Sequence, residues 1–479
     1  MRLLAALLPC LALLTAGPSA AEPVTNQSTA RSGRPNVVFI IADDMNGYGF
    51  YNEFPGVIMP HLEAFRKSAI TFRHAYCAAP SCVPSRAAFF SGQLPSTTGS
   101  YLNGSDPWDK PAMEAVESLP EVFKRGGYTT WGAGKLFHAR ITPARETKAF
   151  DNKPKAGGFG PYLSEADQLA VKGGDGGKWW GAGPWTGPDA DFPDVTNSTD
   201  AIAFLNQKHD KPFFLVLGLW RPHTPFTAPQ RFFALYDEKS LPMPPAGWTA
   251  NDLDDVPAAG RKLAQVWGER WEQTGADHPD LWRRIIWGYL ACNSFADWST
   301  GRVIDALDAS AYAGNTLVVF IGDNGYHCGE KNHFEKSTLW EAAAQVPLAI
   351  RLPGRTQAGT EAAPPVSLVD LFPTLLDYCQ LAPPRQPLDG RSLRPLLDNP
   401  AGAWDHPAVT LYEEHYFSAC DDRYRYIQYP DGTEELYDHT ADPHELTNIA
   451  ARADTAPIKQ RLQKQVPATW ARSLGGRAG

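Results

Sequence analysis

Four short stretches of almost uninterrupted hydrophobic residues stand out along the chain, at residues 36–42, 213–219, 317–321 and 346–350. Runs of this length without polar alternation are typical of strands that are buried on both faces of a sheet. Helix-like patterns lie between them, at residues 119–125 and 281–307. This alternation predicts an α/β fold with a large, mostly parallel sheet that is sandwiched by helices.

The pattern changes towards the end of the chain. After residue 376 a Pro-rich stretch leads to a short alternating run at residues 423–428. We therefore predict a catalytic domain over residues 34–376 and a smaller C-terminal α+β subdomain over residues 377–479. A stretch rich in Gly, Trp and Pro at residues 152–193 predicts a long loop within the first domain.

The N-terminus has the pattern of an export signal. Arg2 precedes an apolar stretch, and small residues follow at positions 17–21. We predict a signal peptide over residues 1–21 and an exported protein, periplasmic or secreted, or lysosomal in a eukaryote. No later apolar run is long enough to cross a bilayer, so we predict no membrane span in the mature chain.

Charge and cysteine content narrow the function classes. The 44 Lys and Arg against 53 Asp and Glu give a net charge of −9, which argues against nucleic-acid binding. Of the seven cysteines, Cys10 lies in the predicted signal peptide. The spacing of the other six shows neither a zinc pattern nor a disulfide framework, and leaves their pairing open: Cys77, Cys82, Cys292, Cys328, Cys379 and Cys420.

Polar residues directly follow two of the predicted strands. Asp43 and Asp44 follow the first strand, and Asp323 and Asn324 follow the third. Ligands of open α/β sheets gather at the carboxyl ends of the strands. Four hard oxygen donors suit calcium better than zinc. Either pair alone would be read as a solvated turn, but two such clusters favour a shared cation.

A second local signal is the run from Cys82 to Arg86. It places a Cys at the start of a predicted helix, where backbone N–H groups favour an anion, and an Arg one turn later. The alternative is a half-buried Cys followed by an ordinary helix that begins near Pro84.

This Cys-Val-Pro-Ser-Arg run resembles the C-x-P-S-R signature of the formylglycine-dependent type I sulfatase family of the alkaline phosphatase superfamily. Further segments resemble the same family, and iduronate-2-sulfatase and its bacterial relatives in particular. They occur in the family's order at residues 35–44, 134–138, 222–226, 322–325 and 329–336. The resemblance covers most of the chain and implies the alkaline-phosphatase-like sulfatase fold.

The resemblance also implies the site residues. One Ca²⁺ ion would be held by Asp43, Asp44, Asp323, Asn324 and the modified Cys82. The catalytic residues would be Cys82, Arg86, Lys135, His138, His223 and Lys336. In such a site Arg86, Lys135 and Lys336 would neutralise the charge on the sulfate oxygens. The resemblance implies that His138 would contact the formylglycine hydrate and that His223 with Lys336 would lie near the leaving oxygen. His327 and His333 lie in a matching segment without an implied role.

In this family the Cys is oxidised after translation to formylglycine (3-oxoalanine), which implies a formylglycine-generating enzyme as a partner during maturation. The hydrated aldehyde has two hydroxyls on one carbon, so that one attacks sulfur and the other then expels sulfate. A thiol or a serine would instead leave an adduct that must be hydrolysed. We therefore expect unmodified Cys82 to be nearly inactive.

The spacing of Lys135 and His138, and residues 326–330, are similar to iduronate-2-sulfatase. This favours a sulfated carbohydrate substrate, from a polysaccharide or a glycosaminoglycan. Four tryptophans either offer stacking faces for sugar rings or pack loops onto the core: Trp108, Trp179, Trp180 and Trp185.

Three other functions stay open at this point. A phosphate or phosphonate monoester hydrolase of the same superfamily would share the metal site. A thiol hydrolase would use Cys82 with a nearby His, but it leaves the four oxygen donors unexplained. A non-catalytic sugar-binding homologue would keep the fold without turnover, and retention of every expected site residue argues against it.

Overall fold

The computed structural model describes residues 33–475, except 52–55, 105, 139–141, 165–180, 267, 353 and 355–356. The predicted signal peptide, Trp179 and Trp180 lie outside the described residues. Among the helices of the described part, none combines the length and the apolar character that a bilayer crossing requires.

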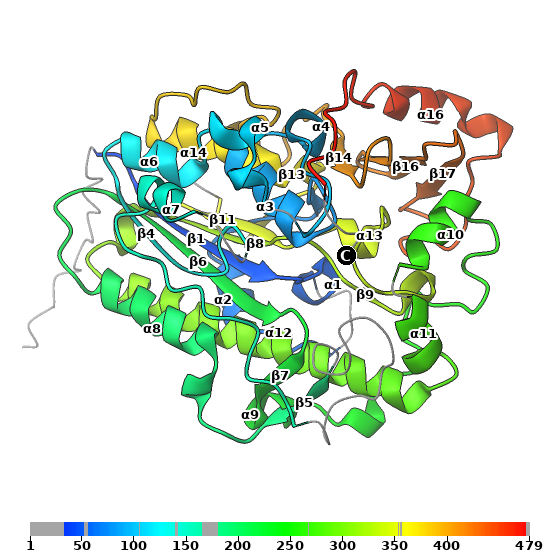
Figure 1. The fold of residues 1–479 in the computed structure, drawn as a ribbon, viewed down its shortest axis with the longest axis horizontal. Coiled ribbons are helices and arrows are strands. Elements are labelled where there is room, and N and C mark those ends of the chain that lie inside the picture. Colours follow the sequence, from blue (N-terminus) through cyan, green and yellow to red (C-terminus); the bar gives the residue numbers. More distant parts are fainter. Residues whose placement is uncertain are drawn as a thin grey trace, which may run out of the picture. The chain divides into compact units, whose positions relative to one another are not determined.

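A seven-stranded sheet forms the centre of the fold (Figure 1), with the strand order β12-β2-β11-β8-β1-β6-β4. Strands β8, β1, β6 and β4 run parallel to one another, and β11 runs antiparallel to both of its neighbours. The predicted mostly parallel sheet is therefore confirmed. The strands are β1 (Asn36–Asp43), β2 (Ile70–Phe72), β4 (Thr129–Gly134), β6 (Phe213–Pro222), β8 (Thr316–Gly322), β11 (Leu348–Arg351) and β12 (Thr360–Ala362).

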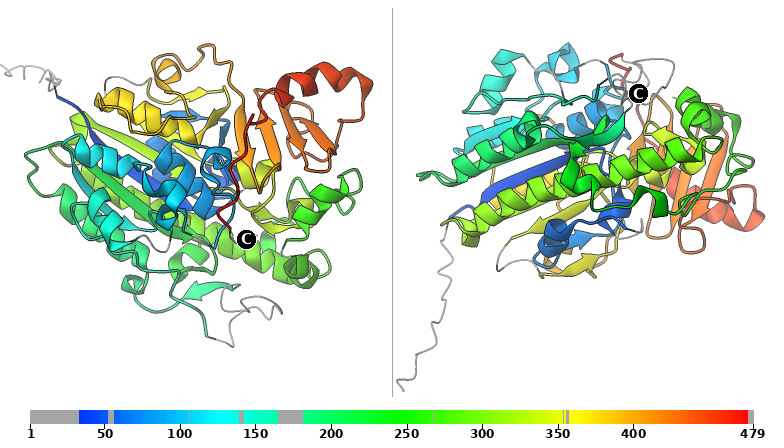
Figure 2. Two further views of the ribbon diagram at one scale, coloured as in Figure 1. Left: turned by 45° about the horizontal axis from the view of Figure 1, so that its top comes forward. Right: turned by 90° about the horizontal axis from the view of Figure 1, so that it is seen from below.

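Helices cover both faces of this sheet (Figures 1 and 2) because successive side chains of its central strand point to opposite sides. Val37, Phe39 and Ile41 pack into one core with residues of α3, α6 and α14. Val38 and Ile40 pack into a second core with residues of α2, α8 and α12. These helices are α2 (Pro60–Arg66), α3 (Cys82–Ser91), α6 (Leu119–Arg125), α8 (Pro193–Leu205), α12 (Pro279–Asp308) and α14 (Leu371–Cys379).

Shorter elements connect these layers. The helices are α1 (Gly47–Phe50), α4 (Pro95–Thr98), α5 (Pro111–Glu114), α7 (Pro143–Ala149), α9 (Gln230–Phe233), α10 (Ala258–Ala264), α11 (Gly268–Thr274) and α13 (Glu341–Ala344). The strands are β3 (Ala75–Tyr76), β5 (Ala182–Trp185), β7 (Phe226–Pro229), β9 (His327–Cys328), β10 (Phe334–Glu335) and β13 (Val366–Ser367). Strand β5 lies inside the stretch that was expected to be a loop, where it pairs with β7.

The C-terminal part forms a separate antiparallel sheet beside the large one (Figure 2), which confirms the smaller α+β subdomain. Its limits at residues 377–479 stay a prediction. The subdomain attaches where the Leu411 N–H donates to the Ala78 carbonyl at 2.9 Å, just ahead of Cys82. Its elements are β14 (Ala408–Leu411), β15 (Phe417–Cys420), β16 (Tyr424–Gln428), β17 (Glu434–Asp438) and α16 (Ala456–Gln463). The preceding helix α15 (Arg394–Asp398) packs into the core of the large sheet.

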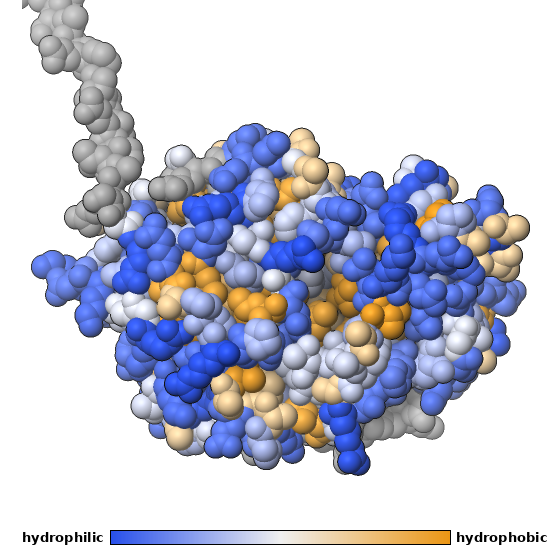
Figure 3. All heavy atoms as spheres, turned by 90° about the horizontal axis from the view of Figure 1, so that it is seen from above, coloured by the Kyte–Doolittle hydropathy of each residue, from blue (hydrophilic) through white to orange (hydrophobic). Residues whose placement is uncertain are grey.

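The hydrophobic side chains are largely inside the protein. The face in Figure 3 is mostly hydrophilic, and its hydrophobic side chains gather in small, separate areas. Among the described residues, the exposed large hydrophobic side chains are Ile58 and Leu235. Isolated exposures of this kind are normal for a folded protein, so this surface gives no sign of an extended apolar binding face. The six cysteines outside residues 1–32 are buried free thiols.

Candidate active site

The carboxyl ends of four neighbouring parallel strands meet at one edge of the large sheet. Asp43 ends β1, Asp323 follows β8, His223 follows β6 and Lys135 follows β4. These strands are adjacent in the order β8-β1-β6-β4. The sheet therefore brings together residues from four distant parts of the sequence, and it does so where α/β folds bind ligands.

The acidic residues at these strand ends form one buried cluster. Carboxylate oxygens of Asp43, Asp44 and Asp323 lie within 4.8 Å of one another. Backbone N–H groups of Asp44 and Asn324 donate to Asp323 Oδ1 at 3.0 and 2.9 Å. The Asn324 amide nitrogen donates to Asp44 Oδ1 at 2.9 Å, while its Oδ1 is buried without a hydrogen-bond partner. An unpaired amide oxygen beside three carboxylates is a donor set that fits a calcium ion.

Three cations surround the carboxylates. Arg86 bonds Asp323 Oδ2 at 2.8 Å and Asp43 Oδ1 at 3.2 Å, and Lys135 Nζ bonds Asp43 Oδ2 at 2.5 Å. Lys336 Nζ pairs with Asp44 Oδ1. Burial alone would raise the pKa of Asp43, but Lys135, together with His223 and Arg86, lowers it well below its usual value. The neighbouring cations therefore hold Asp43 ionised, whereas burial raises the pKa of Asp323.

Cys82 lies within this cluster at the N-terminus of α3. Its Sγ is 3.0 Å from Lys336 Nζ and 3.7 Å from Asp44 Oδ1. Burial raises the pKa of the thiol to about 12, although Lys135 and Lys336 act to lower it. A buried thiol that keeps its proton is a poor nucleophile, which argues against a thiol hydrolase.

Both predicted histidines lie at this edge of the sheet. His223 Nε2 is 3.5 Å from Asp44 Oδ2, and its Nδ1 is 2.7 Å from the Thr224 carbonyl oxygen. Burial lowers the pKa of His223 to about 4, so the imidazole is neutral near pH 7 with its proton on Nδ1. His138 has a φ of 92°, and burial together with Lys135 and Arg86 lowers its pKa well below the usual value. Burial is thus the main cause of the lowered pKa of both rings.

Two glycines allow the chain to turn at Lys135. Gly134, the last residue of β4, has a φ of 79°, in the region that favours glycine. A Cβ on Gly134 would lie 1.8 Å from the Gly218 carbonyl oxygen, and a Cβ on Gly218 would lie 1.8 Å from that of Lys135. The close approach of the two backbones lets the Lys135 N–H donate to the Gly218 carbonyl at 2.9 Å. This turn directs the lysine towards Asp43.

The structure adds residues that the sequence did not indicate. The Tyr289 hydroxyl donates to the Asp44 carbonyl at 2.9 Å and accepts from the Asn46 N–H at 3.0 Å. Asn103 Oδ1 accepts from the Val83 N–H at 2.9 Å, in the first turn of α3. These side chains fix the two backbone segments that carry Asp44 and Cys82. Tyr289 has no motif around it, and Asn103 lies only in an Asn-Gly-Ser glycosylation pattern, so no sequence signal pointed to either of these roles.

Two of the tryptophans that could stack on sugar rings, Trp108 and Trp185, contact other side chains of the protein instead. Trp108 is 3% exposed and packs edge-on against Phe137, with Arg145 over its ring. It therefore packs a loop onto the core, as the alternative interpretation held. The partly buried Trp185 donates from Nε1 to Asp191 Oδ2 at 3.0 Å.

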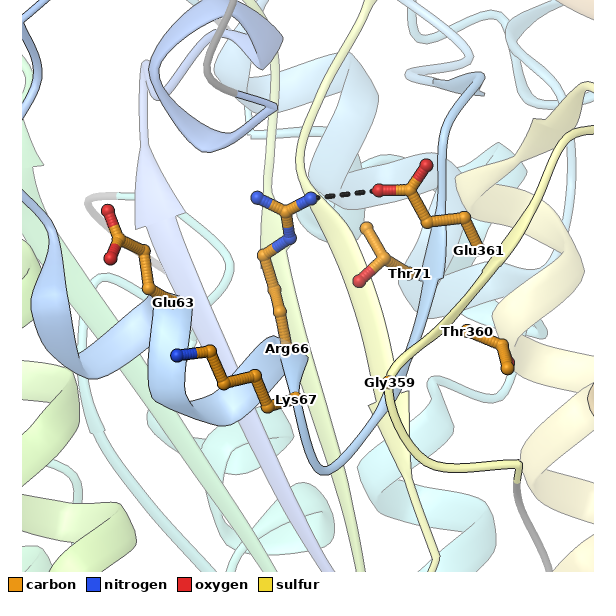
Figure 4. Close-up of a pocket in the computed structure, with 7 residues that line it drawn as sticks. All are labelled: Glu63, Arg66, Lys67, Thr71, Gly359, Thr360 and Glu361. Atoms are coloured by element: carbon orange, nitrogen blue, oxygen red, sulfur yellow. Dashed lines mark hydrogen bonds and ion pairs between the residues drawn. The ribbon is translucent and has the colours of Figure 1, made fainter.

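A surface pocket lies between α2, β2 and β12 (Figure 4). Strand β12 is the outermost strand on the side of the sheet away from β4. Its lining offers two acidic and two basic side chains, and Arg66 pairs with Glu361 at 3.0 Å. This balance of acidic and basic side chains gives no reason to place chemistry there. The lining residues are Glu63, Arg66, Lys67, Thr71, Gly359, Thr360 and Glu361.

A second cluster of metal-ligand types joins the C-terminal sheet to α13. It contains Glu341, Cys420 and His439 within 4.8 Å of one another. Arg425 pairs with both Glu341 and Glu445, and His439 Nε2 lies 2.8 Å from Glu445 Oε1. These ion pairs account for both carboxylates, so the cluster is best explained as a buried connection between the two sheets.

Comparison with known proteins identifies relatives over nearly the whole chain. The family described as "Sulfatase" matches residues 35–381, and the family "N-sulphoglucosamine sulphohydrolase, C-terminal" matches residues 329–471. A protein named sulfatase from Formosa agariphila is 36% identical over 91% of this chain and 88% of its own length. The mouse iduronate 2-sulfatase is 28% identical over 76% of this chain and 72% of its own length.

Solved structures show the same fold. A phosphonate monoester hydrolase of Agrobacterium radiobacter superposes with a TM-score of 0.71 at 21% identity, over 90% of this chain and 94% of that chain. A protein solved with its substrate D-glucosamine-2-N,6-O-disulfate superposes with a TM-score of 0.68 at 21% identity, over 90% of this chain and 96% of that chain. At this identity the likeness concerns the fold alone.

Proposed function

Since the chain belongs to the sulfatase family and is therefore a hydrolase of sulfate esters, we propose that its substrate is a sulfated carbohydrate. We further propose that Cys82 acts after oxidation to formylglycine and that one calcium ion binds beside it. The observation that carries this proposal is the position of Cys82 Sγ, 3.0 Å from Lys336 Nζ and 3.7 Å from a carboxylate of the acidic cluster.

The chain's own cations suit a sulfate group. Arg86, Lys135 and Lys336 together present positive charge in a site from which water is largely excluded, where charges interact strongly. Arg86 is also bonded to the carbonyls of Lys135 and Leu136, so its guanidinium is fixed in place. These residues would bind and orient the nonbridging oxygens of the ester.

The leaving alcohol needs a proton, and we assign the role of donor to Lys336 with His223 beside it. Burial opposes the charge of Lys336, but Asp44 raises its pKa above the usual value, so this ammonium stays protonated at neutral pH. The bond from His223 Nδ1 to the Thr224 carbonyl leaves Nε2 facing the site. His138 would lie against the modified residue 82.

Formylglycine and calcium, the two groups that we propose in addition to the unmodified side chains, have defined roles. Formylglycine supplies a hydrated aldehyde as the nucleophile, and calcium supplies positive charge beside it. Asp43, Asp44, Asp323 and Asn324 would hold the ion together with residue 82. We also propose export through the signal at residues 1–21 and maturation by a formylglycine-generating enzyme.

The proposal that the substrate is a sugar is supported by relatives. The mouse protein is named iduronate 2-sulfatase, and a protein of the same fold was solved with a sulfated glucosamine. Parallel assays of purified protein with sulfated mono- and disaccharides, aryl sulfates, and phosphate and phosphonate monoesters test this. We expect the highest kcat/KM on a sulfated sugar. A higher kcat/KM on phosphonate esters would instead favour the superfamily alternative.

Calcium is expected to stabilise the metal-free protein. A ligand that binds only the folded state adds about 2.7 kcal/mol at 100 times its Kd, so the melting temperature should rise on calcium addition. The matched variant Asn324→Ala removes the unpaired amide oxygen and should reduce the rise. Differential scanning fluorimetry measures both, with magnesium as the comparison ion. A melting temperature that stays constant up to millimolar calcium would contradict the proposed ion.

A further inference from the structure

The turn that carries Lys336 has an unusual backbone. Strands β9 and β10 form a short antiparallel hairpin, and Lys336 directly follows β10. The residues on either side of it, Glu335 and Ser337, have φ values of 77° and 75°. Left-handed backbone at non-glycine residues is strained and persists where surrounding contacts hold it.

One such contact is made by Ser337, the residue after Lys336. The Ser337 N–H donates to the Pro80 carbonyl at 2.9 Å, which ties the turn to the loop ahead of Cys82. This bond fixes the residue after Lys336. The carbonyl of Lys336 itself is held by a different residue, His333.

His333 is buried between two backbone carbonyls. Its Nε2 lies 2.9 Å from the Lys336 carbonyl oxygen, and its Nδ1 lies 2.9 Å from that of Ala264. The ring packs edge-on against His327 at 5.1 Å. Ala264 is the last residue of α10, so its carbonyl is one of those that a helix end leaves unpaired.

The two carbonyls compete for one proton. Both are acceptors, and each needs an N–H from the ring to form a hydrogen bond. Burial lowers the pKa of His333 to about 4, so the neutral ring has a single N–H near pH 7. With the proton on Nε2 the ring braces the Lys336 turn, and with the proton on Nδ1 it caps α10.

We propose that His333 is a positioning residue for Lys336: its Nε2–H bonds the Lys336 carbonyl and holds the left-handed turn that brings Nζ to Cys82 Sγ and Asp44. This inference rests on the proposed function, in which Lys336 acts on the substrate. It gives a role to a histidine that the sequence left without one.

Two variants separate the two ring nitrogens. His333→Gln places an amide donor where Nε2 was, towards Lys336, and His333→Asn places one where Nδ1 was, towards Ala264. We expect His333→Gln to keep kcat within about threefold and His333→Asn to lower it by about 10²-fold, since a misplacement of about 1 Å can cost that much. KM and the melting temperature should differ little between the two. The exposed His278→Gln serves as the control.

All rates are divided by the fraction of the protein in which Cys82 has been oxidised to formylglycine. Equal kcat values for the Asn and Gln variants, or losses that follow the melting temperature, would overturn the positioning role. If both variants unfold, nitrogen-15 NMR of histidine-labelled wild type gives the answer, because an unprotonated Nε2 on His333 refutes the bond and a protonated one supports it. Failure of the proposed function would be seen separately, as wild type that turns over no sulfate ester.

Discussion

Replacing Arg86 with alanine is expected to lower the free energy of unfolding by about 3–5 kcal/mol and to abolish activity. The Arg86 side chain is fully buried and bonds Asp43 and Asp323, which are buried as well. Without the guanidinium both carboxylates stay buried, Asp323 loses its cation and Asp43 keeps only Lys135. The Lys135 and Leu136 carbonyls also lose a donor. Equilibrium denaturation in urea measures the loss of stability.

The matched control is Arg66→Ala. Arg66 also pairs with a carboxylate, that of Glu361, but this pair is partly exposed to solvent. Exposed pairs of this kind contribute about 0–1 kcal/mol. Calcium should recover part of the Arg86→Ala loss, because a second cation then faces the carboxylates. If Arg86→Ala costs no more than Arg66→Ala, the buried cluster does not need its guanidinium and the electrostatic account of the site is wrong.

The sheet and the site could be predicted from sequence because each leaves a local signal. A strand buried on both faces must be hydrophobic throughout, so β1, β6 and β8 are visible as apolar runs. Polar residues directly after such runs have to lie at the carboxyl edge of the sheet. The pairs at Asp43 and Asp323 therefore predicted a common site without knowledge of the strand order.

Other features depend on contacts between distant residues. The short β11 lies antiparallel among parallel neighbours, and its sequence carries no mark of direction. The hydroxyl of Tyr289 bonds the Asp44 carbonyl from within α12. The sequence alone would predict only that an aromatic residue at this position packs in the core. The sequence does not distinguish His333 from other single histidines, because its role depends on contacts with the Lys336 and Ala264 carbonyls. Such partners follow from tertiary packing, which a single sequence does not determine.

The turnover number is expected to rise in proportion to the fraction of Cys82 that has been oxidised, with an intercept near zero. The unmodified thiol is buried beside Asp44, and burial raises its pKa to about 12, so it stays protonated. Even as a nucleophile it would keep the transferred sulfo group on sulfur, and a separate hydrolysis would be required. We expect protein without the modification to retain at most about 10⁻³ of the activity.

Mass spectrometry of the peptide that contains residue 82 gives the converted fraction, and kcat is measured on the same preparations. Cys82→Ala supplies the zero point: it removes one buried atom, so it should fold normally while its kcat falls by about 10³-fold or more. The two measurements separate the alternatives. A thiol hydrolase would keep its rate in preparations with an intact thiol, and a sugar-binding homologue would bind substrate equally in all of them without turnover. Only an oxidised residue 82 makes the rate follow the modification, because the chain's cations and carboxylates are the same in every preparation.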